Sequence, residues 1–139
     1  MTGRGKPARS VDDSLLRISL ERNPQAPSLA RAAITGFTDG SNIDPGTLAT
    51  LSLLVSEVVT NAVVHSVAPP RSEISLYARR LDRGTVRVEI TDQGPGFTPR
   101  PRDPARPDGG YGLYLLDKEA QRWGVDRHGG TRVWFEMAT

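Results

Sequence analysis

The stretch SEVVTNAVVHS, residues 56–66, decides how the chain folds and also raises a question about it. Its valines and alanine need an apolar environment, so the stretch is predicted to be part of a buried helix. Glu57 and Asn61 nevertheless stand four residues apart among them, and His65 follows four residues later. Burying an ionised carboxylate without a partner is costly, so this polar stripe faces either water or a ligand. His65 alone is interpreted as a helix-edge residue.

The residues that border the stripe indicate that it is enclosed. Each helical residue advances by about 100°, which places Leu54 and Val58 on one side of the stripe and Leu53 and Val64 on the other. A solvated helix face would be bordered by charged or small polar side chains instead. We therefore expect the stripe to face a ligand.

Apolar periodicity predicts the elements of the remaining chain. Alternation predicts strands at residues 14–22, 72–81 and 84–92 and a hairpin over residues 123–137 that turns at Gly129-Gly130. Helical spacing predicts helices at residues 27–37, from Asp44-Pro45 to Pro69-Pro70, and at residues 111–123. This order lacks the strand–helix–strand alternation of a parallel sheet. It predicts an α+β fold, a two-layer α/β sandwich in which a mixed, mostly antiparallel sheet carries about three helices on one face.

Two further polar residues are predicted to point to the helix-covered face of the sheet. Asp92 shares its parity with the apolar residues of strand 84–92, and Thr131 shares its parity with those of the final strand. Together with Glu57 and Asn61 they predict a pocket between helix and sheet. A lone Asn or Thr is more often a hydrogen-bonded structural residue, but two inward acids on separate elements favour a functional site.

Residues 93–110 are rich in Pro, Gly and Arg and have no periodicity. A loop of this length in a compact domain is typical of a functional lid or of a disordered segment. The stretches DQGPGF and GGYGL at its ends contain glycines, which let backbone N–H groups approach a ligand, and a helix N-terminus attracts phosphate. The GxxxxGK[ST] motif of P-loop proteins is absent.

Length and composition narrow the class of protein. The 139 residues suffice for one domain, predicted at residues 13–139, after a basic disordered tail at residues 1–12. A net charge of +2 with scattered basic residues does not resemble the basic stripe of a nucleic-acid-binding protein. The chain has no Cys, no secretory signal and no apolar run judged long enough to cross a bilayer, so we expect a cytoplasmic protein without disulfides.

The motifs then show a family resemblance. Their order is Glu57-x3-Asn61, Asp92-x-Gly94-x-Gly96, Gly110-x-Gly112 and Gly130-Thr131. This ordered set, over roughly residues 45–139, resembles the GHKL superfamily with its Bergerat ATP-binding fold. The short chain, SEVVTNAVVHS and the ending TRVWFEM look most like bacterial anti-sigma-factor serine kinases and stand-alone histidine-kinase-like ATPase domains.

The resemblance implies roles for individual residues. Asp92 would accept a hydrogen bond from the adenine amino group, and Thr131 would support another edge of the ring. Asn61 would hold Mg²⁺ between the phosphates, and Glu57 would be the catalytic residue that orients or deprotonates the attacking hydroxyl. The other nucleotide-binding residues that it implies are Gly94, Gly96, Gly110, Gly112 and Leu113.

The resemblance also implies a function. The chain would be an ATP- and Mg²⁺-dependent serine/threonine kinase that phosphorylates a STAS-type anti-anti-sigma protein, regulates a sigma factor and forms a homodimer. No nucleic-acid or membrane partner is expected. One alternative is a nucleotide-binding switch that transfers no phosphate. Another, of a different class, is a nucleic-acid-binding module that uses the Arg-rich tail and loop.

Overall fold

A computed structural model describes residues 15–65, 72–82, 84–93, 111–127 and 129–139, except the side chains of His65 and residues 111–113. The elements are β1 (Leu15–Glu21), α1 (Ala26–Thr38), α2 (Pro45–His65), β2 (Glu73–Asp82), β3 (Thr85–Asp92), α3 (Tyr111–Glu119), β4 (Arg122–Arg127) and β5 (Thr131–Ala138). This is the order of strands and helices that the sequence predicts.

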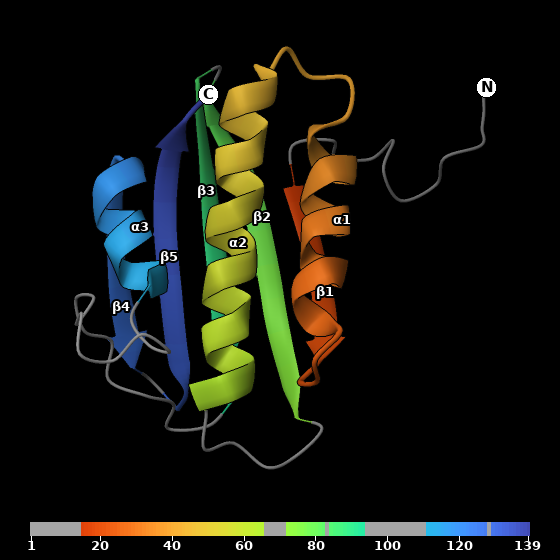
Figure 1. Cartoon of the computed structure of the whole chain (residues 1–139), viewed down its shortest axis with the longest axis vertical. Coiled ribbons are helices and arrows are strands. Elements are labelled where there is room, and N and C mark those ends of the chain that lie inside the picture. The colour runs from red at the N-terminus through yellow and green to blue at the C-terminus, as the bar shows by residue number, and fades with distance from the viewer. Residues whose placement is uncertain (1–14, 66–71, 83, 94–110, 128) are drawn as a thin grey trace, which may run out of the picture.

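The five strands form one open sheet in the order β1-β2-β3-β5-β4 (Figure 1). The three helices lie over one face of it, so the predicted two-layer α+β architecture is confirmed. All four strand pairings are antiparallel, and the described residues contain no parallel pair of the kind that a mixed sheet would have. The chain passes from β3 through α3 and β4 before β5 returns to pair with β3.

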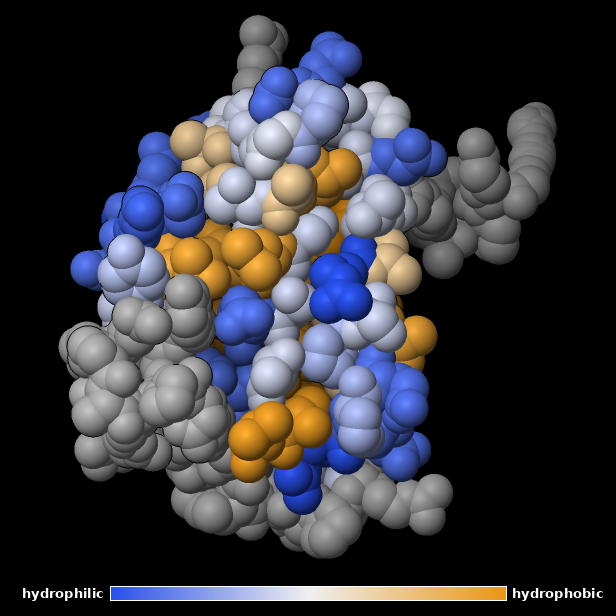
Figure 2. Space-filling model, in the orientation of Figure 1, coloured by the Kyte–Doolittle hydropathy of each residue, from blue (hydrophilic) through white to orange (hydrophobic). Residues whose placement is uncertain are grey.

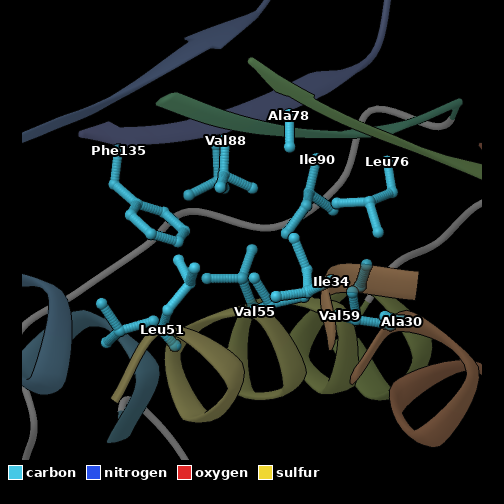
Figure 3. Packing of buried hydrophobic residues seen from close by; sticks show 14 of the residues in the cluster. Ala30, Ile34, Leu51, Val55, Val59, Leu76, Ala78, Val88, Ile90 and Phe135 are labelled. Atoms are coloured by element: carbon cyan, nitrogen blue, oxygen red, sulfur yellow. The ribbon is translucent and has the colours of Figure 1, made fainter. Parts of the chain in front are cut away.

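The core lies between α2 and the inner face of the sheet. Along β3 every second residue from Val86 to Asp92 is buried, as the alternation predicts. In Figure 3, Val55 on the helix points toward Val88 and Ile90 on the sheet. Burying one such side chain stabilises the fold by about 1.5–3 kcal/mol, so α2 is fixed to the sheet along much of its length.

The N-terminus of α2 has the cap that Asp44 predicts. Its Oδ2 atom accepts hydrogen bonds from the backbone N–H groups of Gly46, at 3.0 Å, and Thr47, at 3.3 Å. These two groups have no partner within the helix, so the aspartate fixes where α2 begins.

The expectation that the chain has no apolar run long enough to cross a bilayer was wrong at α2. Residues Pro45–Val64 are long and apolar enough, by length and composition, to cross a membrane. The core helix of a globular domain passes the same test, because it needs apolar residues on the faces that its neighbours cover. Since Leu51, Val55 and Val59 of this helix are fully buried, its composition is weak evidence for a membrane span.

The helix predicted at residues 111–123 is shorter than expected. It ends at Glu119, and Arg122 and Trp123 belong to β4 instead. The backbone N–H of Gln121 donates to the carbonyl of Glu136 at 2.8 Å, and Arg122 pairs with Glu136 in the register of β4 and β5. Pairing with β5 therefore ends the helix, a long-range effect that local periodicity does not contain.

Candidate functional site

Glu57 and Asn61 lie one turn apart on α2, and both side chains are half-buried. On one flank of this stripe Leu54 and Val58 are buried, as expected. On the other flank the expectation of enclosure was wrong, because Leu53 is 44% and Val64 is 62% exposed. The stripe therefore runs along the border between the buried face of α2 and its open side.

Exposed apolar residues are also found on the other helices. Leu29 of α1 and Tyr114 of α3 are about half exposed. Figure 2, which shows the helix-bearing face of the molecule, has separate hydrophobic groups with polar residues between them. The open side of α2 is thus mixed in character, with apolar side chains beside Glu57 and Asn61.

Asp92 and Thr131 meet at one end of the sheet. Asp92 is the last residue of β3 and Thr131 the first of β5, and the two are directly opposite in the antiparallel register. Each is only 2% exposed. Their predicted inward parity is confirmed, so a carboxyl group and a hydroxyl group are buried side by side on neighbouring strands.

Gly130 allows these two strands to meet so closely. A Cβ atom added to it would lie 2.3 Å from the backbone oxygen of Asp92. Real Cβ contacts are essentially never shorter than 3.0 Å, so no larger residue fits without displacing the end of β3. The Gly130-Thr131 motif therefore needs glycine at its first position for a steric reason.

The C-terminal half of α2 lies at the same end of the sheet as Asp92. Asp92 pairs with Ile74 near the start of β2. Just before that strand, Ser72 is hydrogen-bonded to Arg22, which also bonds the carbonyl of Val63 in the last turn of α2. The two polar pairs that the sequence analysis singled out thus share one end of the molecule, toward which α3 points its first turn (Figure 1).

Several predicted site residues cannot be placed. Gly94, Gly96 and Gly110 lie outside the described residues, and of Gly112 and Leu113 only the backbone, in the first turn of α3, is described. The predicted lid at residues 94–110 is likewise not described, so the lid, the pocket that it would complete and the role of these glycines stay predictions.

A metal ion at this site would depend on few protein ligands. Among the residues that the structure describes, no group of three or more His, Asp or Glu side chains could hold a metal ion. Mg²⁺ usually keeps several waters and is bound through one or two protein oxygens plus substrate phosphates. The amide oxygen of Asn61, half-buried beside the carboxyl group of Glu57, suits that manner of binding.

Sequence reasoning missed Arg22, which follows β1. Its Nη1 donates to the carbonyl of Val63 at 3.2 Å, and its Nε donates to Oγ of Ser72 at 3.3 Å. These partners are 41 and 50 residues away in the chain. No local pattern signals such a contact, since an arginine after a strand is usually solvated.

A charge cluster occupies the sheet face opposite the helices. The buried Glu136 on β5 accepts hydrogen bonds from Arg87 and Arg122, each at 2.8 Å. Burial by itself would raise the pKa of Glu136, but the hydrogen bonds and attraction of the two arginines outweigh it and hold that pKa below its ordinary value of 4.5. The parity of Glu136 is opposite to that of Thr131, so the cluster stabilises the sheet and is separate from the site.

The sequence of this chain matches a known protein family and a protein of Streptomyces coelicolor. The family model described as histidine kinase-like ATPase domain matches residues 20–137. The uncharacterized protein SCO4941 of Streptomyces coelicolor is 34% identical over 81 residues, which are 57% of this chain and 75% of that protein. The family match includes every residue of the candidate site.

Solved structures share the fold. A chain with the RsbU and RsbW domains of Rv1364c from Mycobacterium tuberculosis matches 90% of this chain with a TM-score of 0.70 and 22% identity. The blue-light activated histidine kinase EL346 of Erythrobacter litoralis matches 79% with a TM-score of 0.53 and 24% identity. This chain spans only 33% and 39% of those chains, and at such identities the likeness establishes the fold alone.

Proposed function

The chain belongs to the histidine kinase-like ATPase family, and from this premise we propose that it binds ATP with Mg²⁺ and transfers phosphate to a serine or threonine of a partner protein. One observation carries the proposal. A buried carboxyl group, Asp92, and a hydroxyl group, Thr131, meet at the end of the sheet where α2 presents Glu57 and Asn61. The resemblance of the motifs supports the same assignment.

Adenine recognition is assigned to Asp92 and Thr131. A carboxylate is an acceptor with two oxygens, and a hydroxyl both donates and accepts. Buried on adjacent strands, both groups are held rigidly by the ladder of β3 and β5. A carboxylate that is 2% exposed carries a desolvation cost, and a fixed N–H donor such as the adenine amino group would offset part of that cost when it binds.

The phosphate end is assigned to Asn61 and Glu57. The amide oxygen of Asn61 is a suitable Mg²⁺ ligand, and the carboxyl group of Glu57 one turn away can hold an acceptor hydroxyl and take its proton. When bound, ATP and Mg²⁺ supply the transferable phosphoryl group and the neutralisation of its charge. The half-buried setting of both side chains leaves them reachable from the open side of α2.

The partner is proposed to be a STAS-type anti-anti-sigma protein, with a sigma factor as a second partner and a homodimer as the working form, all in the cytoplasm. The support is the resemblance of the motifs to anti-sigma-factor serine kinases. An RsbW domain occurs in a solved chain of the same fold, which agrees with this assignment without testing it.

A second candidate function is a nucleotide-dependent switch without phosphate transfer. It is favoured by the exposed Leu53 and Val64, which border the stripe of Glu57 and Asn61. Apolar side chains beside a nucleotide site can form a partner contact that changes with nucleotide. Nucleic-acid binding through the Arg-rich tail and loop is less favoured, since the chain has a net charge of only +2 and its basic residues are scattered.

The first experiment tests adenine recognition with Asp92→Asn. The amide loses the charge that strengthens the hydrogen bond and has only one acceptor oxygen. We expect ATP affinity to fall at least tenfold, since a hydrogen bond to a charged group contributes about 1.5–3 kcal/mol. Calorimetry with ATP measures it, and circular dichroism checks the fold. Unchanged affinity in a folded variant would rule out this role for Asp92.

The second experiment separates binding from transfer. Asn61→Ala removes a metal ligand, so Mg²⁺-dependent ATP binding and any transfer should both be lost. Glu57→Gln keeps the shape but cannot take a proton, so transfer should fall about 10²–10⁴-fold while binding persists. ATP affinity with and without Mg²⁺ and single-turnover phosphorylation of candidate partners are measured. Transfer at the wild-type rate by Glu57→Gln excludes Glu57 as the base, and no transfer by the wild type favours the switch.

A further inference from the structure

Arg22 joins three elements at the end of the molecule that carries the candidate site. Its backbone N–H donates to the carbonyl of Ser72 at 2.9 Å, and its Nε donates to the hydroxyl of the same serine. Its Nη1 donates to the carbonyl of Val63. One side chain therefore connects the end of β1, the start of β2 and the last turn of α2.

The carbonyl of Val63 lies in the last turn of α2 that the structure describes. A hydrogen bond from a charged donor such as a guanidinium is stronger than one between neutral groups. Arg22 therefore fixes this turn, which contains Asn61, to the end of β1 and the start of β2.

We propose that Arg22 is a positioning residue for Asn61, and through it for the metal-bound phosphates of the nucleotide. This inference rests on the proposed function. Asn61 stands two residues before Val63 in the same turn, so its amide oxygen moves with that turn. The adenine end of the site, Asp92 and Thr131, is carried by β3 and β5 of the sheet. Loss of Arg22 should therefore weaken Mg²⁺-dependent binding more than binding without the metal.

Arg80 on β2 provides a matched control. Its Nη2 donates to the carbonyl of Phe37, in the last turn of α1, at 3.2 Å, and also to the hydroxyl of Ser41. This is the same chemistry, a guanidinium that joins a helix carbonyl and a serine. It stands near the opposite end of β2 from Ile74, the residue that pairs with Asp92, so it stabilises the fold away from the site.

The experiment compares Arg22→Gln, Arg22→Lys and Arg80→Gln in the full chain. Hydrogen exchange of the amides of residues 60–65 is measured first, without nucleotide. In Arg22→Gln their exchange should accelerate about 5- to 30-fold, the scale of a lost hydrogen bond from a charged donor. Arg80→Gln should leave these amides within twofold of the wild type, and Arg22→Lys should restore part of the protection.

ATP affinity with MgCl₂ and with EDTA is then measured by calorimetry. In Arg22→Gln the affinity with Mg²⁺ should fall at least fivefold more than the affinity in EDTA, whereas Arg80→Gln should change both alike. If the amides of residues 60–65 exchanged at the same rate in Arg22→Gln and Arg80→Gln, the proposal would be overturned. This outcome does not depend on whether the wild type binds ATP. A wild type without ATP affinity would refute the proposed function by itself.

Discussion

The close approach of β5 to the end of β3 makes Gly130 the sharpest test of the site. In Gly130→Ala the new Cβ atom must move from 2.3 Å to at least 3.0 Å from the backbone oxygen of Asp92, a displacement of 0.7 Å. The obstacle is backbone, which cannot rotate away as the tip of a flexible side chain would. Since the carbonyl and carboxyl groups belong to one residue, the Asp92 side chain has to shift too.

The size of the effect follows from hydrogen-bond geometry. A good N–H···O bond has a length near 2.9 Å, and a distance of 3.6 Å is no longer a hydrogen bond. A shift of 0.7 Å spans that range, so the contribution of a charged acceptor, about 1.5–3 kcal/mol, would be largely lost. We expect ATP affinity to fall at least tenfold in Gly130→Ala and overpacking to destabilise the fold by about 1–3 kcal/mol.

The adjacent Gly129 is the control. It has a φ of +72° and nothing within 4 Å of its added Cβ. Alanine there is strained by about 1–2 kcal/mol but pushes on no part of the site, so stability should fall while ATP affinity stays within twofold. Calorimetry with ATP and thermal unfolding measure both variants. If folded Gly130→Ala binds ATP as the wild type does, the assignment of adenine to the end of β3 fails.

Two further predictions concern residues away from the site. Asp44→Ala removes the cap of α2 and should cost about 1 kcal/mol of stability without altering ATP affinity; an altered affinity would show that the start of the helix is coupled to the site. The folded-state pKa of Glu136 is lowered, so its stabilisation is present above the ordinary carboxyl pKa and is lost as the pH falls through the lowered folded value. Glu136→Gln should lower the free energy of unfolding by about 1–2 kcal/mol at pH 7. The stability of this variant should also fall less steeply than that of the wild type as the pH is lowered. Urea unfolding of both proteins from pH 7 to pH 3 measures this. Parallel curves of stability against pH for the wild type and the variant would contradict it.

The inward placement of Asp92 and Thr131 was predictable because a strand has a period of two that does not drift. Alternation along β3 and β5 fixes which residues face the helices, and the two residues only had to share parity with their neighbours. The order of elements was predictable because strands and helices differ in their apolar period. Asp44 also signalled the start of α2 by its own chemistry as a cap.

The open flank of α2 and the end of α3 were not predictable from local pattern. The exposure of Leu53 and Val64 depends on how far the neighbouring elements reach around α2, which no residue within α2 encodes. The end of α3 is set by pairing between β4 and β5. Arg22 finds Val63 at a separation of 41 residues, a contact that only the assembled sheet and helices create.

The apolar helix α2 has a consequence for how the protein is made. It precedes four of the five strands that the structure describes. Val88, Ile90 and Phe135, which face it in the core (Figure 3), all lie on strands that leave the ribosome later. Until then a segment as apolar as a membrane span has no sheet to cover it, and exposed hydrophobic surface of this kind promotes aggregation. The burial that secures the finished domain therefore leaves a strongly apolar segment uncovered in the unfinished chain during its synthesis.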